Sequence, residues 1–571
     1  MIGVPRTRRA PSRLLALAAA VLLAAACSST EAPSGGRSPS PEDGSPSASP
    51  RVEVSAFARR TACGLPREWL QRIANGYDPE RSADIQILPN VPNFVGAGLP
   101  HVGPWDFTSD VPMFWYGPGY IKPTGSVQKP ADLPDVMATW SHILDSSFQS
   151  PDGEPLLDGL VPAGERPEPP RLLVMMVWDG AGRAVLEQWP DAWPNLSALR
   201  SDGAWYENAT VGSSPTSSAQ IHATFGTSAY PSHHGVPGHT IRIDGELVSP
   251  WKDGPREMEL ETFGDHFDAE HGNEPLVGVA GTVPIQLGMM SRGAYADGGD
   301  RDVAVLRVPG KALTLGAEGE TWNLPEDYHE WYEYPEYANE LPPLPSYFDD
   351  VQLDERDGRR DGMWHGHAYE DSEELLNGFH TPARVPYQTR LIEEMITREG
   401  FGDDETTDLF FINYKLIDTL GHLYGMEDET MRDAVETQDR DLTRFIDFLD
   451  EQVGQGRWAM VLTADHGSLM SSEATGAFQI SAEKLHGAIQ EEFDEDDDNV
   501  RVAEQVKQTE IFMNVEELEE HGHTLDDVSR FIMNLRQSEL QIPGLPVRDP
   551  DAKVFQAAFP AEALLNLPCL P

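Results

Sequence analysis

The chain has 571 residues, of which 39% are hydrophobic and 24% charged, so it can form a large core. Lys and Arg number 42 against 94 Asp and Glu, which gives a formal net charge of −52. Such a surface repels nucleic-acid backbones and anionic lipid, so we exclude nucleic-acid binding; an anionic substrate would need local positive charge, for which metal ions are the natural source.

The first 26 residues have the features of a bacterial export signal. Four arginines precede the apolar run 14–26, which is short for a membrane span. The run ends in Leu-Ala-Ala-Ala-Cys, which resembles a lipoprotein box in which Cys27 is lipidated; the alternative is an ordinary secretory signal with a chance Cys. Residues 27–57 follow as a predicted Ser/Pro-rich tether. We therefore expect a lipid anchor on the outer face of the bacterial cytoplasmic membrane.

Two cysteines remain once Cys27 is assigned to the lipid. Cys63 and Cys569 lie one near each end of the remaining body. In an oxidising compartment, two leftover cysteines suggest a disulfide, although the sequence alone leaves their pairing open.

Residues 58–571 alternate apolar strands with amphipathic helices. Several of the strands are continuously apolar, as expected for strands buried on both faces of a parallel sheet. We predict strands over 84–88, 111–117, 172–178, 276–281, 303–308, 408–414, 458–463 and 510–515, and helices over 133–145, 387–399 and 431–453. This order indicates one large α/β domain with a mostly parallel sheet and helices on both faces.

Residues 293–383 interrupt the alternation. Part of this segment is acidic, aromatic and rich in proline, and it has no clear period. We predict an insertion or cap over the sheet; the alternative is a decorated loop without a functional role.

Polar side chains follow three of the predicted strands. Asp179 ends one strand, Asp465 and His466 follow another, and Asp418 and His422 lie four residues apart on one face of a helical turn. Ligands bind beyond the carboxyl ends of strands in open α/β sheets. Each Asp alone could simply cap a helix. Together, however, these residues form a nitrogen and oxygen ligand set that suits zinc.

A candidate nucleophile lies in the sequence between Asp179 and the later Asp and His residues. The Ser/Thr-rich loop that begins at Gly212 enters a predicted helix near Ser218. A helix N-terminus offers free backbone N–H groups and a positive dipole end to a phosphate oxyanion. A hydroxyl there can act as a nucleophile if a metal lowers its pKa. The alternative is a serine that only caps the helix.

The motifs resemble those of the alkaline phosphatase superfamily, particularly its type I phosphodiesterase/nucleotide pyrophosphatase branch. In chain order they are Val-Trp-Asp-Gly, Pro-Thr-Ser-Ser, a His four residues later, Tyr-Pro-Ser-His-His-Gly, Asp-Thr-Leu-Gly-His and Ala-Asp-His-Gly. The resemblance implies two divalent ions, with zinc expected, and a phosphoseryl intermediate on the nucleophile. One ion would be held by Asp179, Asp465, His466 and the hydroxyl of Ser218, and the other by Asp418 and His422.

The second ion needs one more histidine, which this family supplies late in the chain. The histidines that follow His466 lie in contexts that we interpret as structural. Residues 98–121 instead resemble the family's late segment, with His-x-Gly, an aromatic residue before Asp, Val-Pro and an aromatic strand. We therefore predict a circular permutant in which residues 64–160 hold the family's C-terminal segment and His101 completes the second site. The alternative is a loop histidine in an unrelated N-terminal cap.

The resemblance also bears on the substrate, expected to be a small phosphoester. His239 falls where the phosphodiesterase branch has an Asn that contacts a phosphate oxygen, so the resemblance implies a role for His239 in substrate binding. Monoesterase relatives carry Lys-x-Arg after a strand that here reads Val-Gly-Val-Ala, without either cation. This difference favours diesters, with Arg242 and Arg292 as candidate substitutes. A phosphomonoesterase and a non-enzymatic surface binding lipoprotein remain the alternatives, and the sequence does not reveal the oligomeric state.

Overall fold

The computed structural model describes residues 54–96, 98–307, 322–370, 372, 375–376, 378–494 and 500–570. The predicted signal peptide, Cys27 and most of the predicted tether lie outside these residues. Helix α1 (Ala56–Ala62) begins before the predicted end of the tether, because the hydroxyl of Ser55 accepts a hydrogen bond from the backbone of Ala58 and caps the helix. Among the described helices, we find none with the length and hydrophobicity needed to cross a bilayer.

A nine-stranded sheet forms the larger part of the fold. Its strands, in spatial order, are β11 (Tyr332–Glu333), β10 (Asp302–Val305), β9 (Val277–Ala280), β14 (Asp408–Tyr414), β5 (Leu172–Trp178), β15 (Trp458–Thr463), β3 (Met113–Tyr116), β6 (Ala204–Thr210) and β4 (Gly125–Asp132). All neighbours from β11 to β15 are parallel, whereas β3 is antiparallel to both of its neighbours. The predicted mostly parallel α/β sheet is therefore confirmed.

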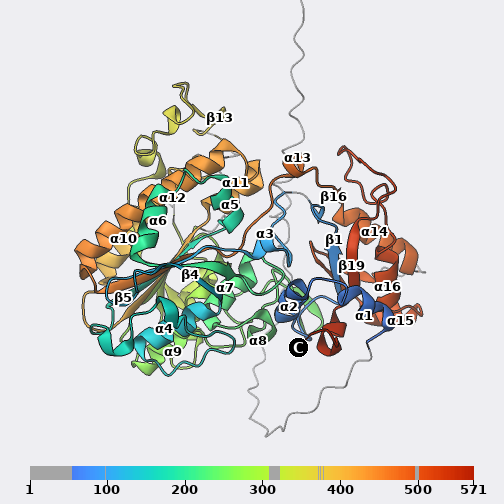
Figure 1. Cartoon of the computed structure of the whole chain (residues 1–571), viewed down its shortest axis with the longest axis horizontal. Helices are drawn as coiled ribbons and strands as arrows, with labels where there is room; N and C mark the ends of the chain where they lie inside the picture. The colour runs from blue at the N-terminus through green and yellow to red at the C-terminus, as the bar shows by residue number, and fades with distance from the viewer. Residues whose placement is uncertain are drawn as a thin grey trace, which may run out of the picture. The chain divides into compact units, whose positions relative to one another are not determined.

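Helices cover both faces of this sheet (Figure 1). One face carries α6 (Pro194–Leu199), α10 (Arg384–Glu399) and α12 (Glu429–Leu449); the other carries α4 (Asp135–Leu144), α7 (Ser218–Thr227) and α9 (Phe263–Glu270). Every residue of β5, β14 and β15 is buried, which explains why these strands are apolar without alternation. The polar residues Asp179, Asp418 and Asp465 come after the buried parts of these three strands, beyond their carboxyl ends.

A second sheet has four strands, all antiparallel to their neighbours. In spatial order they are β17 (Ala503–Val506), β18 (Glu510–Met513), β1 (Ile85–Pro89) and β19 (Phe555–Pro560). Helices α14 (Ala482–Phe493) and α16 (Leu525–Ile532) pack with it around a separate apolar core. The strands near residues 84–88 and 510–515 were predicted, but the sequence did not reveal that they leave the main sheet, because strand periodicity does not specify a partner.

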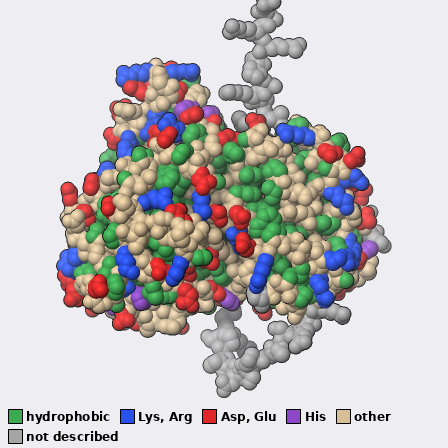
Figure 2. Space-filling model, viewed as in Figure 1, with side chains coloured by type: hydrophobic (Ala, Val, Ile, Leu, Met, Phe, Trp, Pro, Cys, Tyr) green, Lys and Arg blue, Asp and Glu red, His purple; other side chains and the backbone are tan. Residues whose placement is uncertain are grey.

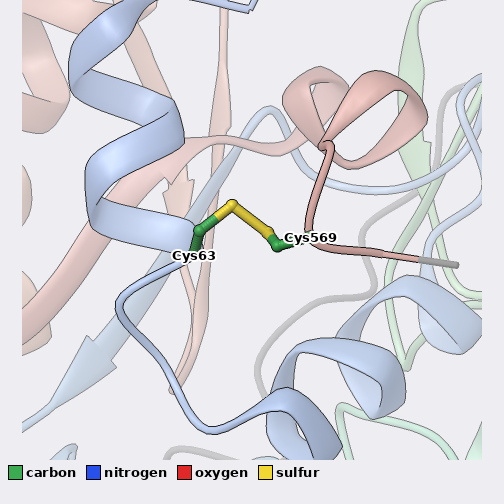
Figure 3. Close-up of a disulfide and its surroundings, with 2 residues drawn as sticks. All are labelled: Cys63 and Cys569. Atoms are coloured by element: carbon green, nitrogen blue, oxygen red, sulfur yellow. A yellow bond between two sulfur atoms is a disulfide. The ribbon is translucent and has the colours of Figure 1, made fainter.

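The two ends of the described chain are joined covalently. Cys63, directly after α1, forms a disulfide with Cys569, 506 residues later (Figure 3). The Cα atoms of the two cysteines are 5.8 Å apart. The suggested disulfide is thus confirmed.

The predicted insertion over residues 293–383 is not separate from the sheet. Its strands β10 and β11 extend the parallel edge beside β9. The rest of the segment, where the structure describes it, includes short 3₁₀ helices and the small hairpin of β12 (Met363–Trp364) and β13 (His367–Ala368), which projects from the body (Figure 1). The prolines of this segment suit short turns better than regular elements.

Shorter elements connect these layers. They include α2 (Arg67–Gly76), α3 (Asp106–Ser109), α5 (Arg183–Gln188), α8 (Pro231–His234), α11 (Leu416–Tyr424), α13 (Ser472–Thr475), α15 (Val515–Glu520), β2 (Phe94–Val95) with β16 (Gln479–Ile480), and β7 (Ile241–Ile243) with β8 (Glu246–Val248). On the face drawn in Figure 2, acidic and basic side chains are interspersed and neither sign forms a continuous patch.

Candidate metal centre and nucleophile

The three predicted strand ends meet at one point. Asp179 follows β5, Asp465 and His466 follow β15, and Asp418 lies in the first turn of α11 after β14. The Nε2 atom of His466 lies 3.5 Å from a carboxylate oxygen of Asp465, 3.8 Å from one of Asp418 and 4.0 Å from one of Asp179. All four side chains are buried. Parallel strands that end at the same edge therefore gather three carboxylates around one imidazole.

His101 joins this cluster from the other end of the sequence. Its Nε2 atom lies 3.2 Å from Nε2 of His422, and His422 Nε2 lies 3.5 Å from a carboxylate oxygen of Asp418. One ligand atom from each of these three residues fits within a span of 4.8 Å. The structure thus brings His101 to the place where the sequence predicted a third ligand.

The donor set fits divalent cations. His101 Nδ1 and one oxygen of Asp465 are buried without a hydrogen-bond partner, which is uncommon for buried polar atoms. Between the carboxylates lies the ammonium of Lys415, with Nζ 2.6 Å from Asp179 and 2.8 Å from Asp418. This ammonium marks a position where the carboxylates attract positive charge. Carboxylate oxygens and imidazole nitrogens are ligands that zinc accepts.

Electrostatics shift the pKa values of the cluster in different directions, and burial together with the neighbouring Asp465 raises the pKa of Asp179. Burial opposes ionisation of Asp418, but Lys415 and His422 outweigh this effect and hold its pKa well below the usual range. Burial would lower the pKa of Lys415, yet Asp179 and Asp418 raise it above the usual value. Burial and the neighbouring His466 and His422 lower the pKa of His101, so its ring remains neutral, the form that binds metal.

Ser218 begins α7 beside this cluster. Its hydroxyl oxygen lies 3.5 Å from Lys415 Nζ, and its side chain is buried. The helix cap is the preceding residue, Ser217, whose hydroxyl donates to Gln220 and makes no capping hydrogen bond. Ser218 is therefore not the cap of its helix, and no side chain caps the first turn.

His222 is held by two hydrogen bonds of its own. Its Nδ1 lies 2.7 Å from the carbonyl of Ser218, and its Nε2 lies 2.8 Å from the side-chain nitrogen of Asn413. The carbonyl of Ser218 accepts a hydrogen bond from the Nδ1–H group of His222. Nε2 is then unprotonated and accepts a hydrogen bond from the side-chain N–H of Asn413. His222 lies near Asp179 and Asp465, but the lone pair on its Nε2 atom already accepts the hydrogen bond from Asn413. These contacts indicate a structural role for His222.

His239, for which the resemblance implies a role in substrate binding, is influenced by charges from both sheets. The side chain of His239 is exposed to solvent. Surrounding protein atoms desolvate it and lower its pKa to about 4, with Lys415, Lys507 and His466 as positive neighbours. His239 thus has charged neighbours both in the candidate metal centre and in the turn between β17 and β18, where Lys507 lies.

The two arginines proposed to replace the missing cations are already engaged. Arg242 binds Asp84 and Glu504 and donates to a backbone carbonyl, and Arg292 binds the buried carboxylate of Asp265. That expectation was wrong, because both guanidinium groups serve the packing of other elements.

The sequence reasoning missed Asn413 and Lys415. Asn413 Nδ2 donates to Asp179 over 3.0 Å, and its carbonyl oxygen accepts from Gln286 over 2.6 Å. This amide therefore orients both Asp179 and His222. The available signal was an Asn and a Lys at the end of an otherwise apolar strand, directly before Asp418.

A family model described as type I phosphodiesterase/nucleotide pyrophosphatase matches residues 173–552. The chain belongs to this family. It is a family of phosphoester hydrolases within the alkaline phosphatase superfamily, as the motifs indicated. The match begins at β5, so the segment that carries His101 lies outside it.

Curated relatives of this phosphodiesterase-family chain include two alkaline phosphatases. PafA of Elizabethkingia meningoseptica is 27% identical over 167 residues, which are 28% of this chain and 30% of PafA. PhoV of Synechococcus elongatus is 33% identical over 73 residues, 13% of each chain. A protein of Myroides odoratus named calcium-transporting ATPase is 23% identical over 343 residues, 54% of this chain and 61% of that protein. The matches thus span less than two thirds of each relative.

Among solved structures, wild-type alkaline phosphatase PafA aligns with a TM-score of 0.47 and 16% identity, over 69% of this chain and 85% of PafA. Phosphonoacetate hydrolase from Sinorhizobium meliloti in complex with phosphonoacetate aligns with a TM-score of 0.29 and 16% identity, over 53% of this chain and 58% of that one.

Proposed function

We propose that this family member is an extracytoplasmic two-metal phosphoester hydrolase that acts through a phosphoseryl intermediate on Ser218. The observation that carries the proposal is the position of Ser218, at the uncapped start of α7 and beside a buried cluster of metal-binding side chains.

Two divalent ions, with zinc expected, are assigned to this cluster. Asp179, Asp465, His466 and the Ser218 hydroxyl would hold one, and Asp418, His422 and His101 the other. When bound, such ions lower the pKa of coordinated hydroxyl groups and neutralise charge on the entering and leaving oxygens of an in-line displacement. Asp418 lies near both proposed ligand sets, since its carboxylate approaches His466 of the first set and His422 of the second.

The residues of the chain then have distinct roles. The Ser218 oxygen bonds to phosphorus as the bond to the leaving oxygen breaks, and the leaving group departs with a proton. The free N–H groups at the start of α7 bind a phosphoryl oxygen. Asn413 holds the Asp179 carboxylate and His222 in place. Water then cleaves the phosphoseryl ester, which releases phosphate or a phosphate monoester and restores the hydroxyl.

The position of His101 supports the proposed circular permutation. Residues 64–160 lie outside the family match, yet they supply β3 to the centre of the nine-stranded sheet and His101 to the ligand cluster. The disulfide between Cys63 and Cys569 would close the junction where the relatives' chain runs on. Permutation is tolerated where chain ends lie close together.

We also propose that the body is exported and anchored through lipidated Cys27. This rests on the N-terminal sequence alone, and the presence of a disulfide is in keeping with an oxidising compartment. A binding module that has lost catalysis is the alternative from another class, and the complete ligand set argues against it.

Diester hydrolysis remains the first candidate, because the Lys-x-Arg pair of monoesterases is absent. A phosphomonoesterase is the second candidate, and one observation favours it. The ammonium of Lys415 lies 3.5 Å from the Ser218 hydroxyl and brings a positive charge to the position where a dianion would bind.

The decisive experiment measures hydrolysis of an aryl phosphate diester and an aryl phosphate monoester, with Ser218→Ala and Ser217→Ala as a matched pair. Loss of one catalytic nucleophile should reduce turnover by about 10³-fold or more, whereas Ser217→Ala should retain most of it. Acid-quenched wild-type protein should carry phosphate on Ser218. Equal activity of the two variants would contradict the proposal, and the better substrate decides between the candidates.

A further inference from the structure

Two arginines without an acidic partner lie beside the metal centre. The guanidinium carbons of Arg307 and Arg384 lie 3.5 Å and 4.2 Å from the centre of the same ring, that of Phe379. Among the described residues, no carboxylate forms an ion pair with either one. This is unusual in a chain with 94 acidic and 42 basic residues.

Burial makes this arrangement costly. Arg384 is 2% exposed, and its Nε is buried without a hydrogen-bond partner. Desolvation and the charge of Arg307 lower the pKa of Arg384 to about 9, and desolvation lowers that of Arg307 to about 10. Buried charges are normally paired, because the free energy lost when an ion leaves water must be offset by a counter-charge. Within the part of the chain that the structure describes, the pair therefore has no carboxylate counter-ion.

The missing anion would lie at the same edge of the sheet as the metal centre. Arg384 donates to the hydroxyl of Thr282, two residues beyond the end of β9. The Thr282 backbone donates to Gln286, whose side chain donates to Asn413. Asn413 in turn holds Asp179, as described above. The negative charges of Asp179 and Asp418 also act on Arg384.

Access is provided by the second arginine. Arg307 is partly exposed, whereas Arg384 and Phe379 are buried behind it. A ligand group that reaches Arg307 from solvent would lie against the aromatic ring that the Arg384 guanidinium also contacts. Guanidinium groups present fixed, paired N–H donors that match the oxygens of carboxylates and phosphates.

We propose that Arg307 and Arg384 form a binding site for a second oxyanion, a carboxylate or phosphate group that the substrate carries beside its scissile phosphoryl group. This inference rests on the proposed function of the neighbouring centre. It names the substrate class as phosphoesters with an additional negative charge, and it assigns the two arginines to substrate selection.

The experiment compares ligands that differ by one carboxylate. Phosphonoacetate is paired with propylphosphonate, and 2-carboxyethylphosphonate with butylphosphonate, at two spacings from phosphorus. Dissociation constants are measured by calorimetry on the whole protein. Calorimetry does not require turnover, so failure here is distinguishable from failure of the hydrolase proposal. Arg384→Met and Arg307→Met are compared with Arg398→Met, at the other end of α10, whose guanidinium carbon lies 4.8 Å from the ring centre of Tyr337.

At one spacing or both, the wild-type protein should bind the carboxylate ligand at least about 10-fold more tightly than its alkyl partner. Each of the two test variants should reduce this ratio to about 2 or less, and Arg398→Met should leave it unchanged. Arg307→Met keeps the test available if the buried Arg384→Met variant fails to fold.

Three outcomes overturn the proposal. The first is a ratio near one in the wild-type protein at both spacings. The second is a ratio that survives both substitutions. In the third, Arg384→Met weakens carboxylate and alkyl ligands equally, and the arginines then bind the transferred phosphoryl group instead of a second anion.

Discussion

The two sheets of the molecule differ in how they are assembled and in what they carry. The strands of the nine-stranded sheet from β9 to β15 are parallel, and three of them end in carboxylates at one edge. The four-stranded sheet is antiparallel and takes its strands from both ends of the body. Among the described residues, all the assigned metal ligands lie with the larger sheet.

The difference follows from strand direction. Parallel strands place all their carboxyl ends on one edge, so residues distant in sequence converge there. Antiparallel strands alternate their ends and gather no such cluster. Lys507 lies in the turn between β17 and β18 of the smaller sheet, and the Cys63–Cys569 disulfide joins the ends of the body. The candidate metal ligands thus lie with the larger sheet because of the direction of its strands. Three substitutions test this difference between the two sheets.

The largest effect is expected for His101→Ala, which removes the proposed metal ligand that comes from outside the family match. The variant should lose one of two bound ions per chain and at least about 100-fold of its activity, the upper end of what loss of an outer-shell metal partner costs. Metal content by elemental analysis and turnover under the same conditions provide the measurement.

His486→Ala is the matched control for His101→Ala. His486 lies in α14 beside the smaller sheet, and its ring contacts the carbonyl of Ala503 over 2.8 Å. This variant should keep both ions. If His101→Ala also keeps both, then His101 is not a ligand and the permutation proposal loses its main support.

An intermediate effect is expected for Cys63→Ser, which removes the disulfide between Cys63 and Cys569. Because the disulfide joins residues 506 apart, its loss should lower the free energy of unfolding by about 2–5 kcal/mol. Activity at room temperature should remain, since the metal centre lies with the other sheet. Urea unfolding and turnover, each with and without reductant for the wild-type protein, test this. A loss of activity in the folded variant would show that the sheets are not separable.

The smallest effect is expected for Glu510→Gln in β18. Burial raises the pKa of Glu510 from 4.5 to about 7. A carboxyl whose pKa is higher in the folded state binds more protons there, so its contribution to stability falls as the pH rises from about 5 through 7. A neutral Gln at this position does not ionise, so its contribution to stability does not fall as the pH rises. The variant should gain roughly 1–3 kcal/mol relative to wild type between pH 5 and pH 8.

Urea unfolding at pH 5 and pH 8 measures the effect of Glu510→Gln. The exposed Glu491, in α14, supplies the control Glu491→Gln, which should follow the wild-type protein at both pH values. Parallel stability profiles for Glu510→Gln and wild type would mean that Glu510 is ionised in the folded protein.

Local pattern predicted the larger sheet better than the smaller one. Strands such as β5 and β14 are apolar throughout because both faces are buried, and Asp179 and Asp418 were recognisable as polar residues at their ends. The predicted ligands His101, Asp418 and His422 do lie together. The pairing of β1 with β18 and β19 was not predictable, because it depends on contacts between strands more than 400 residues apart.

The remaining errors have a common cause. Arg242 and Arg292 were expected to compensate for missing cations, but their acidic partners come from distant elements that no local pattern reveals. For the same reason Lys415 was missed, since its role depends on the buried carboxylates around it. Sequence motifs identify the residues that bind, whereas long-range packing decides which charges are already neutralised.

The disulfide gives the body one further property. Because Cys63 and Cys569 are bonded, the polypeptide between them is a closed loop that includes both sheets. A protease that cuts this loop once, at an exposed turn such as the β12–β13 hairpin, releases no fragment, because the two pieces remain joined through sulfur. Cleavage there would be visible only under reducing conditions, and two cuts within the loop would be needed before a segment of it could be released.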